Sequence, residues 1–192
     1  MKKLFVFDFD KTIYLGDSSI DIYLYELKKN ILLIRFLPVQ FFGMLMYKLK
    51  LKPKEYFKEK YFSFLKGVKD IDNDVIEFWN KNESKIKRDM LVGKKNIVVI
   101  SASPEFLLKP ICDRVGIDKL IATKVDSKTG KFLSNNCYGK EKVKRLEEEF
   151  SEYEIEEFYS DSNSDVHLAL IAKSSFLVNK DKIEEWKLKK VK

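Results

Sequence analysis

Short apolar runs alternate along most of the chain with stretches of helical periodicity. We expect five strands, over residues 3–9, 96–101, 120–123, 155–160 and 175–178, because each run is apolar or β-branched and bounded by polar residues. Apolar residues at helical spacing fall between or after these runs, over 105–115, 141–150 and 166–172. Strands that alternate with helices predict an α/β fold with a parallel sheet and right-handed crossovers.

Residues 16–90 break this alternation, because they contain no convincing strand. Asp17 is a candidate N-cap for a first helix, and a second helix follows Pro38 up to residue 47. Pro53 opens a third helix over 54–65, which Gly67 ends, and a fourth covers 75–86. A simple crossover needs only a dozen or more residues. We therefore expect an all-helical domain at 16–90, inserted into a core made of 1–15 and 91–192.

Composition excludes several classes of protein. The chain has 192 residues, which fits one domain with a modest insertion, and 45% of them are hydrophobic, enough to build a core. Cys112 and Cys137 show no CxxC spacing, so a disulfide scaffold is excluded and a cysteine zinc site is disfavoured. With 35% charged residues the protein is not membrane-embedded, and the longest nearly apolar run, at 31–47, is interrupted by Arg35, Pro38 and Gln40.

Charge is concentrated in one part of the chain. Residues 28–60 contain nine basic and two acidic residues, which together equal the net charge of +7 of the whole sequence. Such a segment can attract an anionic substrate, nucleic acid or an anionic membrane, or it can be a solvated lysine-rich face. The apolar run near the N-terminus ends at Asp8 without a cleavage motif. We therefore expect a cytoplasmic protein without a signal peptide.

Carboxylates follow two of the expected strands. Asp8 and Asp10 leave the first strand on one side, and Asp161 and Asp165 follow the fourth. In doubly wound sheets, ligands bind at the carboxyl ends of strands. Closely spaced carboxylates repel each other unless a cation or a shared proton neutralises them, and oxygen-only ligands suit Mg²⁺.

Two further segments could bind an anion. The second strand ends in Ser101-Ala102-Ser103-Pro104, where a hydroxyl precedes a proline-opened helix whose free N–H groups can bind phosphate. Lys140 and Lys142 lie at the start of another expected helix, where a lysine is unfavourable with the helix dipole. An anionic partner would explain such a position.

The four segments in this order resemble the motifs of the haloacid dehalogenase superfamily, and within it the branch of the phosphoserine phosphatases. They are Asp8-Phe9-Asp10-Lys11-Thr12, then Ser101, then Lys140 or Lys142, then Asp161 with Asp165. The resemblance implies a Rossmann-like parallel sheet with an inserted helical cap. It also implies a phosphatase that hydrolyses a small phosphomonoester through an aspartyl-phosphate.

The resemblance implies a role for each motif. Asp8 would be the nucleophile and Asp10 the general acid and base. Mg²⁺ would be held by Asp8, the Asp10 carbonyl and Asp161, with Asp165 either as a further ligand or as a support of the ligands. Phosphate contacts would come from the following residues: Thr12, Ser101, Ala102, and Lys140 or Lys142. The resemblance is compatible with either lysine. The second aspartate disfavours dehalogenation.

The substrate is less well specified by the resemblance. In phosphoserine phosphatases a carboxylate soon after the first motif binds the substrate amine, and Asp17 falls near that position. The cap arginine that binds the substrate carboxylate is replaced here by Tyr61, which cannot form a charged fork, so we expect phosphoserine to be a poor substrate.

The same residues are compatible with other functions and partners. A phosphomutase or phosphotransferase would use the same residues, and a non-catalytic protein could use the basic segment on nucleic acid or an anionic membrane. We expect a small phosphorylated metabolite as partner, with no nucleic acid and no membrane contact, and leave the oligomeric state open.

Overall fold

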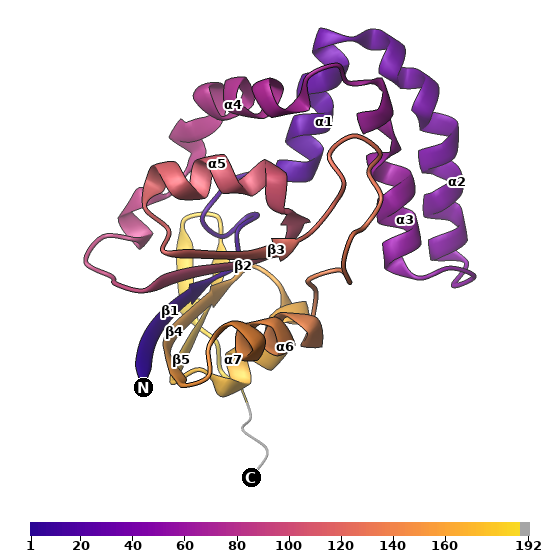
Figure 1. Ribbon diagram of the computed structural model, residues 1–192. Helices are drawn as coiled ribbons and strands as arrows, with labels where there is room; N and C mark the ends of the chain where they lie inside the picture. The colour runs from indigo at the N-terminus through magenta and orange to yellow at the C-terminus, as the bar shows by residue number, and fades with distance from the viewer. Residues whose placement is uncertain (189–192) are drawn as a thin grey trace.

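The computed structural model describes residues 1–188, which form one central sheet covered by helices (Figure 1). The sheet has the strand order β3-β2-β1-β4-β5-β6. All neighbouring strands pair in parallel except β5 and β6, which are antiparallel. The strands are β1 (Lys2–Phe7), β2 (Ile97–Pro104), β3 (Lys119–Thr123), β4 (Tyr153–Ser160), β5 (Ser174–Asn179) and β6 (Lys182–Glu185).

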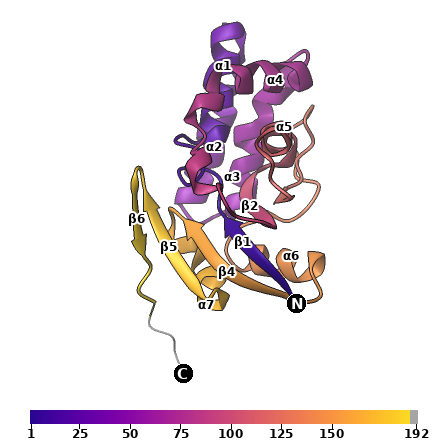
Figure 2. The ribbon, with the colours of Figure 1, turned by 90° about the vertical axis from the view of Figure 1, so that its left-hand side faces the viewer.

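The alternation of side chains along β1 distributes the core over both faces of the sheet. Leu4 and Val6 pack with the helices α6 (Lys140–Glu149) and α7 (Val166–Ile171), whereas Phe7 belongs to the cluster that includes α5 (Glu105–Val115). Figure 2 shows α5 and the pair α6 and α7 on opposite sides of the sheet. The expected α/β fold with its parallel sheet is confirmed. The expected strands and core helices are found with shifts of at most three residues at their ends, and α5 has the expected bounds.

Residues between β1 and β2 are helical, as expected. The helices are α1 (Ser18–Lys29), α2 (Leu37–Lys48), α3 (Lys54–Tyr61) and α4 (Ile71–Asn82), joined by short 3₁₀ helices over Ile31–Phe36, Phe62–Gly67, Glu83–Lys85 and Arg88–Met90. Three expected boundaries were wrong, namely the end of the third helix and both ends of the fourth, which finishes at Asn82 rather than at residue 86. The third helix tightens into a 3₁₀ helix at Phe62, and the fourth begins at Ile71 because the Asp70 side chain accepts a hydrogen bond from the Asn73 N–H.

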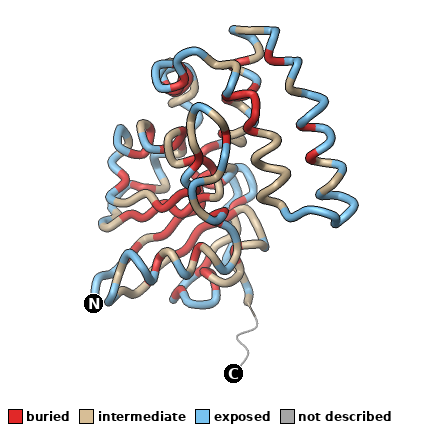
Figure 3. The backbone as a smooth tube through the Cα atoms, turned by 45° about the vertical axis from the view of Figure 1, so that its right-hand side comes forward, coloured by how far each residue is buried: buried red, intermediate tan, exposed pale blue. Residues whose placement is uncertain are grey.

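One apolar cluster joins the helical insertion to the sheet. Trp79 of α4 is fully buried, contacts Phe9 and Tyr14 edge-on, and donates its indole N–H to the carbonyl of Leu107 in α5 over 2.7 Å. Figure 3 shows buried backbone running through the sheet and up into this part of the insertion. The division at residues 16 and 90 therefore stays a prediction.

Residues Ile31–Lys48 are long and apolar enough, by length and composition alone, to cross a membrane. Their mean hydropathy is 1.4, and only 17% of the segment is buried. The segment consists of the 3₁₀ helix Ile31–Phe36 followed by α2 rather than one α-helix.

Candidate active site

A cavity of about 360 Å³ opens at the carboxyl ends of β1, β2 and β4, between the sheet and α3. This is the position at which the strand order reverses around β1, and where ligands bind in open parallel sheets. Nine residues that the sequence singles out line it: Asp8, Asp10, Asp17, Tyr61, Ser101, Ala102, Lys142, Asp161 and Asp165.

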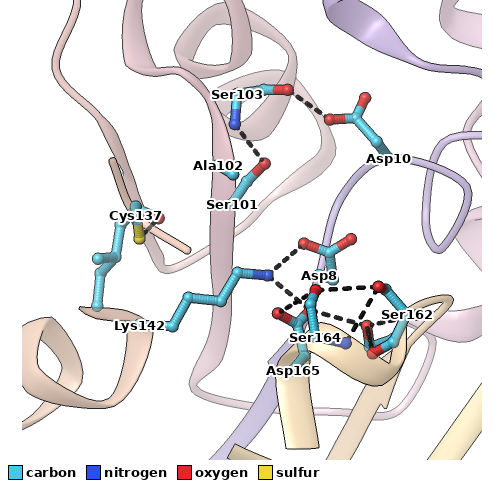
Figure 4. A network of polar contacts seen from close by, with 12 residues as sticks. Asp8, Asp10, Ser101, Ala102, Ser103, Cys137, Lys142, Ser162, Ser164 and Asp165 are labelled. Carbon is cyan, nitrogen blue, oxygen red and sulfur yellow. Dashed lines mark hydrogen bonds and ion pairs between the residues drawn. The ribbon is translucent and has the colours of Figure 1, made fainter. Parts of the chain in front are cut away.

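An ion-paired triad lies at the floor of the cavity. Lys142 Nζ is 2.6 Å from Asp8 Oδ1 and 2.7 Å from Asp165 Oδ2, and the lysine is only 2% exposed (Figure 4). Ser160 donates a further hydrogen bond to Asp165 Oδ2 over 2.8 Å. No described residue donates a hydrogen bond to Asp8 Oδ2, so this oxygen is available to a molecule bound in the cavity.

Burial controls the protonation of this triad. Desolvation raises the pKa of Asp8 to about 7, against the opposing effect of Lys142. Burial lowers the pKa of Lys142, but the carboxylates of Asp8 and Asp165 outweigh it and raise the pKa above its usual value. The ammonium therefore stays charged. One cation faces two buried carboxylates, which leaves an uncompensated negative charge when both are ionised.

Asp10 is held on the opposite side of the cavity. Its Oδ1 accepts a 2.6 Å hydrogen bond from the Ser18 N–H at the start of α1, and its Oδ2 accepts one from the Ser103 hydroxyl. Figure 4 shows its carboxyl group beside Ser103 and turned away from Lys142. Burial raises the pKa of Asp10, and the nearby carboxylate of Asp17 adds to this. The hydrogen bonds from Ser103 and Ser18 oppose this rise, but the net shift is toward the protonated form of the carboxyl group, the form that a general acid uses.

Two of the proposed phosphate contacts are absent from the cavity. Thr12 is fully buried, its hydroxyl has no partner among the described residues, and it does not line the cavity. Lys140 is exposed on α6 and also lies outside. The two lysines are separated by about 200° around the helix, so only Lys142 points inward. Ser101 and Ala102 line the cavity, and Ser101 Oγ accepts the Ser103 N–H over 3.1 Å.

The carboxylates fit a hard divalent cation by their chemistry. Asp8, Asp161 and Asp165 line the same cavity, and burial raises the pKa of Asp161 as it does that of Asp8. A bound dication would stabilise these ionised forms. Residues 1–188 contain no preformed group of three or more His, Cys, Asp or Glu side chains arranged around one metal position. Two carboxylates and a backbone carbonyl would form a smaller protein ligand set, as is usual for Mg²⁺.

Helix α3 supplies the other wall of the cavity. Lys58 donates to the carbonyl of Ala102 over 2.7 Å and to Asn136 Oδ1 over 3.1 Å. Burial, and to a lesser degree the charge of Lys54, lowers the pKa of Lys58 to about 8. The Tyr61 hydroxyl donates to the Ser19 carbonyl over 3.1 Å, and Asp17 accepts the Ile20 N–H as the N-cap of α1. Lys58 and Tyr61 thus lie on the same wall of the cavity, together with Lys54.

Sequence reasoning missed three residues that shape the site. Ser103 binds Asp10, whereas Asn136 and Lys58 bind each other across the gap between the sheet and the insertion. The spacing Ser101-Ala102-Ser103 at a strand end was a usable signal for Ser103. Nothing in the local sequence marks Asn136 or selects Lys58 among the lysines of α3, because their roles depend on contacts between distant segments.

Comparisons with known proteins agree with this geometry. A family model of the haloacid dehalogenase-like hydrolases matches residues 5–170. Protein CicA of Caulobacter vibrioides is 33% identical over 126 residues, which cover 57% of this chain and 56% of CicA, so the match spans little more than half of that relative.

Two solved structures have a similar fold. The first is a protein of unknown function from Bordetella pertussis Tohama I, with a TM-score of 0.72 and 21% identity over 91% of this chain and 89% of that chain. The second is a phosphoserine phosphohydrolase-like protein from Francisella tularensis, with a TM-score of 0.60 and 18% identity over 91% of this chain and 86% of that chain.

Proposed function

Because the chain belongs to the haloacid dehalogenase-like hydrolases, we propose that it is a phosphatase that hydrolyses a small phosphomonoester through an aspartyl-phosphate. The observation that carries this proposal is the triad, in which Lys142 holds one oxygen of Asp8 and leaves the other toward the cavity. The similarity of fold to a phosphoserine phosphohydrolase-like protein supports the same class of reaction.

In the first step, Asp8 Oδ2 attacks phosphorus and the bond between phosphorus and the leaving oxygen breaks. Asp10, in its protonated form, gives its proton to the departing alkoxide, so that an alcohol leaves, and burial favours this role because it raises the pKa of Asp10. Ser103 and the N–H of Ser18 keep the Asp10 carboxyl group on the side of the cavity nearest the helical insertion, where the leaving group would lie.

In the second step, a water molecule attacks the phosphorus of the aspartyl-phosphate. Asp10, now ionised, accepts a proton from this water, the bond between phosphorus and Asp8 breaks, and inorganic phosphate leaves. Lys142 offsets negative charge near the phosphoryl group in both steps, and Ser101 and Ala102 lie where they can hydrogen-bond its oxygens.

We propose Mg²⁺ as the cofactor, held by Asp8, the Asp10 carbonyl and Asp161. When bound, it would neutralise phosphoryl charge and position the phosphate oxygens. Asp165 Oδ2 accepts hydrogen bonds from Lys142 and Ser160 and so orients the lysine, whereas Oδ1 accepts only a 3.5 Å hydrogen bond from Ser164 and could be a further ligand of the metal.

The substrate proposal follows from the wall formed by α3. Tyr61 cannot form the bidentate pair with a carboxylate that arginine forms, and loss of such a contact costs about a hundredfold in specificity. Lys54 and Lys58 line the cavity and favour an anionic phosphomonoester, whereas Asp17 suits an amine or hydroxyl group. Phosphoserine should rank low in a screen of phosphometabolites, and a kcat/KM well above the others would contradict this proposal.

The deciding experiment measures phosphate release from an aryl phosphate with and without Mg²⁺. Wild-type protein should require the metal, and Asp8→Asn should abolish turnover because an amide is not a nucleophile. Near-native activity of Asp8→Asn, in a sample checked for deamidation by mass spectrometry, would contradict the proposal. A phosphomutase or phosphotransferase would instead pass the phosphoryl group to an added acceptor and release little inorganic phosphate.

A further inference from the structure

Half of the large exposed hydrophobic residues in the described chain lie in one short segment. Of 22 such residues, eleven fall between Ile31 and Leu51, on the 3₁₀ helix, α2 and the turn after it. We call them the apolar cap surface: Ile31, Leu32, Ile34, Leu37, Val39, Phe41, Phe42, Leu45, Tyr47, Leu49 and Leu51. Exposed apolar clusters of this kind mark interaction surfaces.

The orientation of α2 is the reverse of that expected for a helix of a soluble core. It buries Gln40 and Gly43 and exposes Phe41 and Phe42, which are 62% and 50% accessible. Gln40 is fixed in this position, since it accepts from the Tyr23 hydroxyl over 3.0 Å and donates to the Tyr61 carbonyl over 2.9 Å. Specific polar contacts therefore hold the apolar side chains outward.

Positive charge surrounds the apolar cap surface. Residues 27–54 contain seven basic residues and no acidic one. Within residues 1–188, Lys29 alone among these seven forms ion pairs, with Asp74 and Glu77. The last residue of α2 and the turn after it read Lys48-Leu49-Lys50-Leu51-Lys52, so that apolar and cationic side chains alternate on an exposed tip.

From this juxtaposition we propose that the apolar cap surface docks onto an anionic lipid bilayer. Phenylalanine and leucine side chains would enter the boundary between headgroups and acyl chains, while the flanking lysines contact anionic headgroups. Lysine stems can lie along the apolar region with their ammonium groups at the headgroups. This interaction lies beyond the phosphatase reaction, and it departs from the expectation, drawn from sequence, of no membrane contact.

The geometry favours a helix that lies on the bilayer over one that crosses it. The twelve residues of α2 span about 18 Å, which is short of the roughly 30 Å of a hydrocarbon core. The preceding segment is anchored by Leu33, which is fully buried and packs on Gly67. Figure 1 shows α2 on the outer side of α3, and Figure 3 shows it exposed along most of its length.

The positive charge around the apolar cap surface argues against two other partners for this surface. A second copy of the chain would bring two surfaces together that each carry several unpaired lysines, and like charges in contact cost several kcal/mol. Nucleic acid would satisfy the lysines but leave isoleucine, leucine and valine side chains against phosphates, where aromatic or polar contacts are needed. An anionic bilayer satisfies both features at once.

The test is flotation of the full chain with vesicles. Wild-type protein should float with vesicles of phosphatidylcholine and phosphatidylglycerol, bind less to phosphatidylcholine alone, and be partly released by high salt. Because binding is the readout, the outcome is independent of whether the chain is a phosphatase. Far-ultraviolet circular dichroism shows that each variant is folded.

The apolar contribution is tested by Phe41→Ser with Phe42→Ser, two exposed positions whose replacement leaves the buried contacts intact. We expect vesicle affinity to fall at least tenfold. The matched control is Ile76→Ser with Val92→Ser, exposed apolar residues outside the surface, which should bind like wild type.

The electrostatic contribution is tested by changing Lys48, Lys50 and Lys52 together to glutamine. Each lysine near an anionic surface contributes about fivefold, so the triple variant should lose about a hundredfold at low salt. The charge-matched control replaces three exposed lysines outside the helical insertion by glutamine. These are Lys128, Lys131 and Lys144, and their replacement should have little effect on vesicle binding.

Several results would overturn the proposal. They are no flotation with anionic vesicles, flotation unaffected by the apolar and lysine substitutions, and equal losses in the matched controls. A doubled mass in light scattering without vesicle binding would assign the surface to a second copy. Retention on nucleic acid without vesicle binding would assign it to that partner.

Discussion

Lys142 lies only two positions after Lys140, but the two side chains have different surroundings. Lys142 is nearly inaccessible and contacts Asp8 and Asp165, whereas Lys140 is exposed. Lys142→Met should therefore lower kcat on an aryl phosphate at least a hundredfold, as does loss of other groups that stabilise transition-state charge. Lys140→Met should stay within about twofold. Steady-state kinetics of the two variants check this.

Removing Lys142 also leaves two buried carboxylates facing each other, which lowers the free energy of unfolding. If Lys142→Met does not fold, the double variant with Asp165→Asn removes one of the charges and should restore folding without restoring activity. A folded single variant that keeps more than about a tenth of wild-type kcat would remove Lys142 from the mechanism.

Glu26 on α1 gives a prediction about stability. It is 2% exposed, its Oε1 has no hydrogen-bond partner among the described residues, and Asp74, Glu77 and Lys29 surround it. Burial, with a further effect of Asp74, raises the pKa of Glu26 to about 7. Its folded form therefore binds a proton more tightly than the unfolded chain does, and the stability it contributes is lost as the pH rises from about 4.5 through 7.

Replacing Glu26 by glutamine should remove this loss. Above pH 7, Glu26→Gln should be more stable than wild type by about 1–2 kcal/mol, and its stability should vary less between pH 5 and 8. Urea unfolding at several pH values measures both effects. The control is Glu147→Gln, an exposed position on α6. Equal pH profiles for wild type and Glu26→Gln would show that Glu26 is ionised when folded.

At the scale of residues, the sequence predicted which side chains surround the cavity better than it predicted the contacts that each of them makes. Asp8, Asp10, Asp161 and Asp165 are found around one cavity because they follow strands whose carboxyl ends meet at one edge of the sheet. Thr12 belongs to the same motif but its hydroxyl is enclosed by the fold. Such a difference depends on packing by distant residues and leaves no local pattern.

At the scale of elements, Gly130 connects the loop after β3 to the helical insertion. Its φ is +75°, and a Cβ there would lie 2.3 Å from the carbonyl oxygen of Phe62. Gly130→Ala should lower the free energy of unfolding by about 2–3 kcal/mol and make the loop more sensitive to limited proteolysis. Gly93→Ala is the matched control, because φ is +76° there but nothing lies within 4 Å.

Gly93→Ala should show only the cost of the left-handed conformation, about 1–2 kcal/mol. If the two alanine variants lost equal stability and equal protease resistance, the close approach of Gly130 to Phe62 would make no measurable contribution to the free energy of unfolding. Chemical denaturation of both variants, with proteolysis under native conditions, distinguishes these results.

The elements themselves were predicted where apolar periodicity is strong. The strands β1, β2 and β4 and the helix α5 follow from their apolar runs, because their side chains pack on both sides of the sheet. Strand β6 was missed, since Lys182–Glu185 is exposed throughout and pairs only at the sheet edge. The start of α4 was misplaced because Asp70 was not recognised as its cap.

At the scale of the molecule, Trp79 joins the insertion to the core through one continuous apolar cluster. We expect a single cooperative unfolding transition. Trp79→Phe removes the hydrogen bond to Leu107 and some packing volume, and should lower stability by about 1–3 kcal/mol without splitting the transition. Trp186, the other tryptophan, then reports the core by fluorescence while circular dichroism reports all helices. Two separate transitions would show that insertion and core unfold independently.

The central position of β1 has a consequence for synthesis of the chain. On one edge, Lys2 pairs with Tyr153, so about 150 residues must be translated before that partner exists. At about 5–20 residues per second, this edge of a phenylalanine-rich strand stays unpaired for roughly 8–30 s. During that time β1 is open to pairing with other nascent chains, and Lys2 and Lys3 are the charged residues that oppose such association. Slower translation would lengthen the exposure and increase the demand on chaperones.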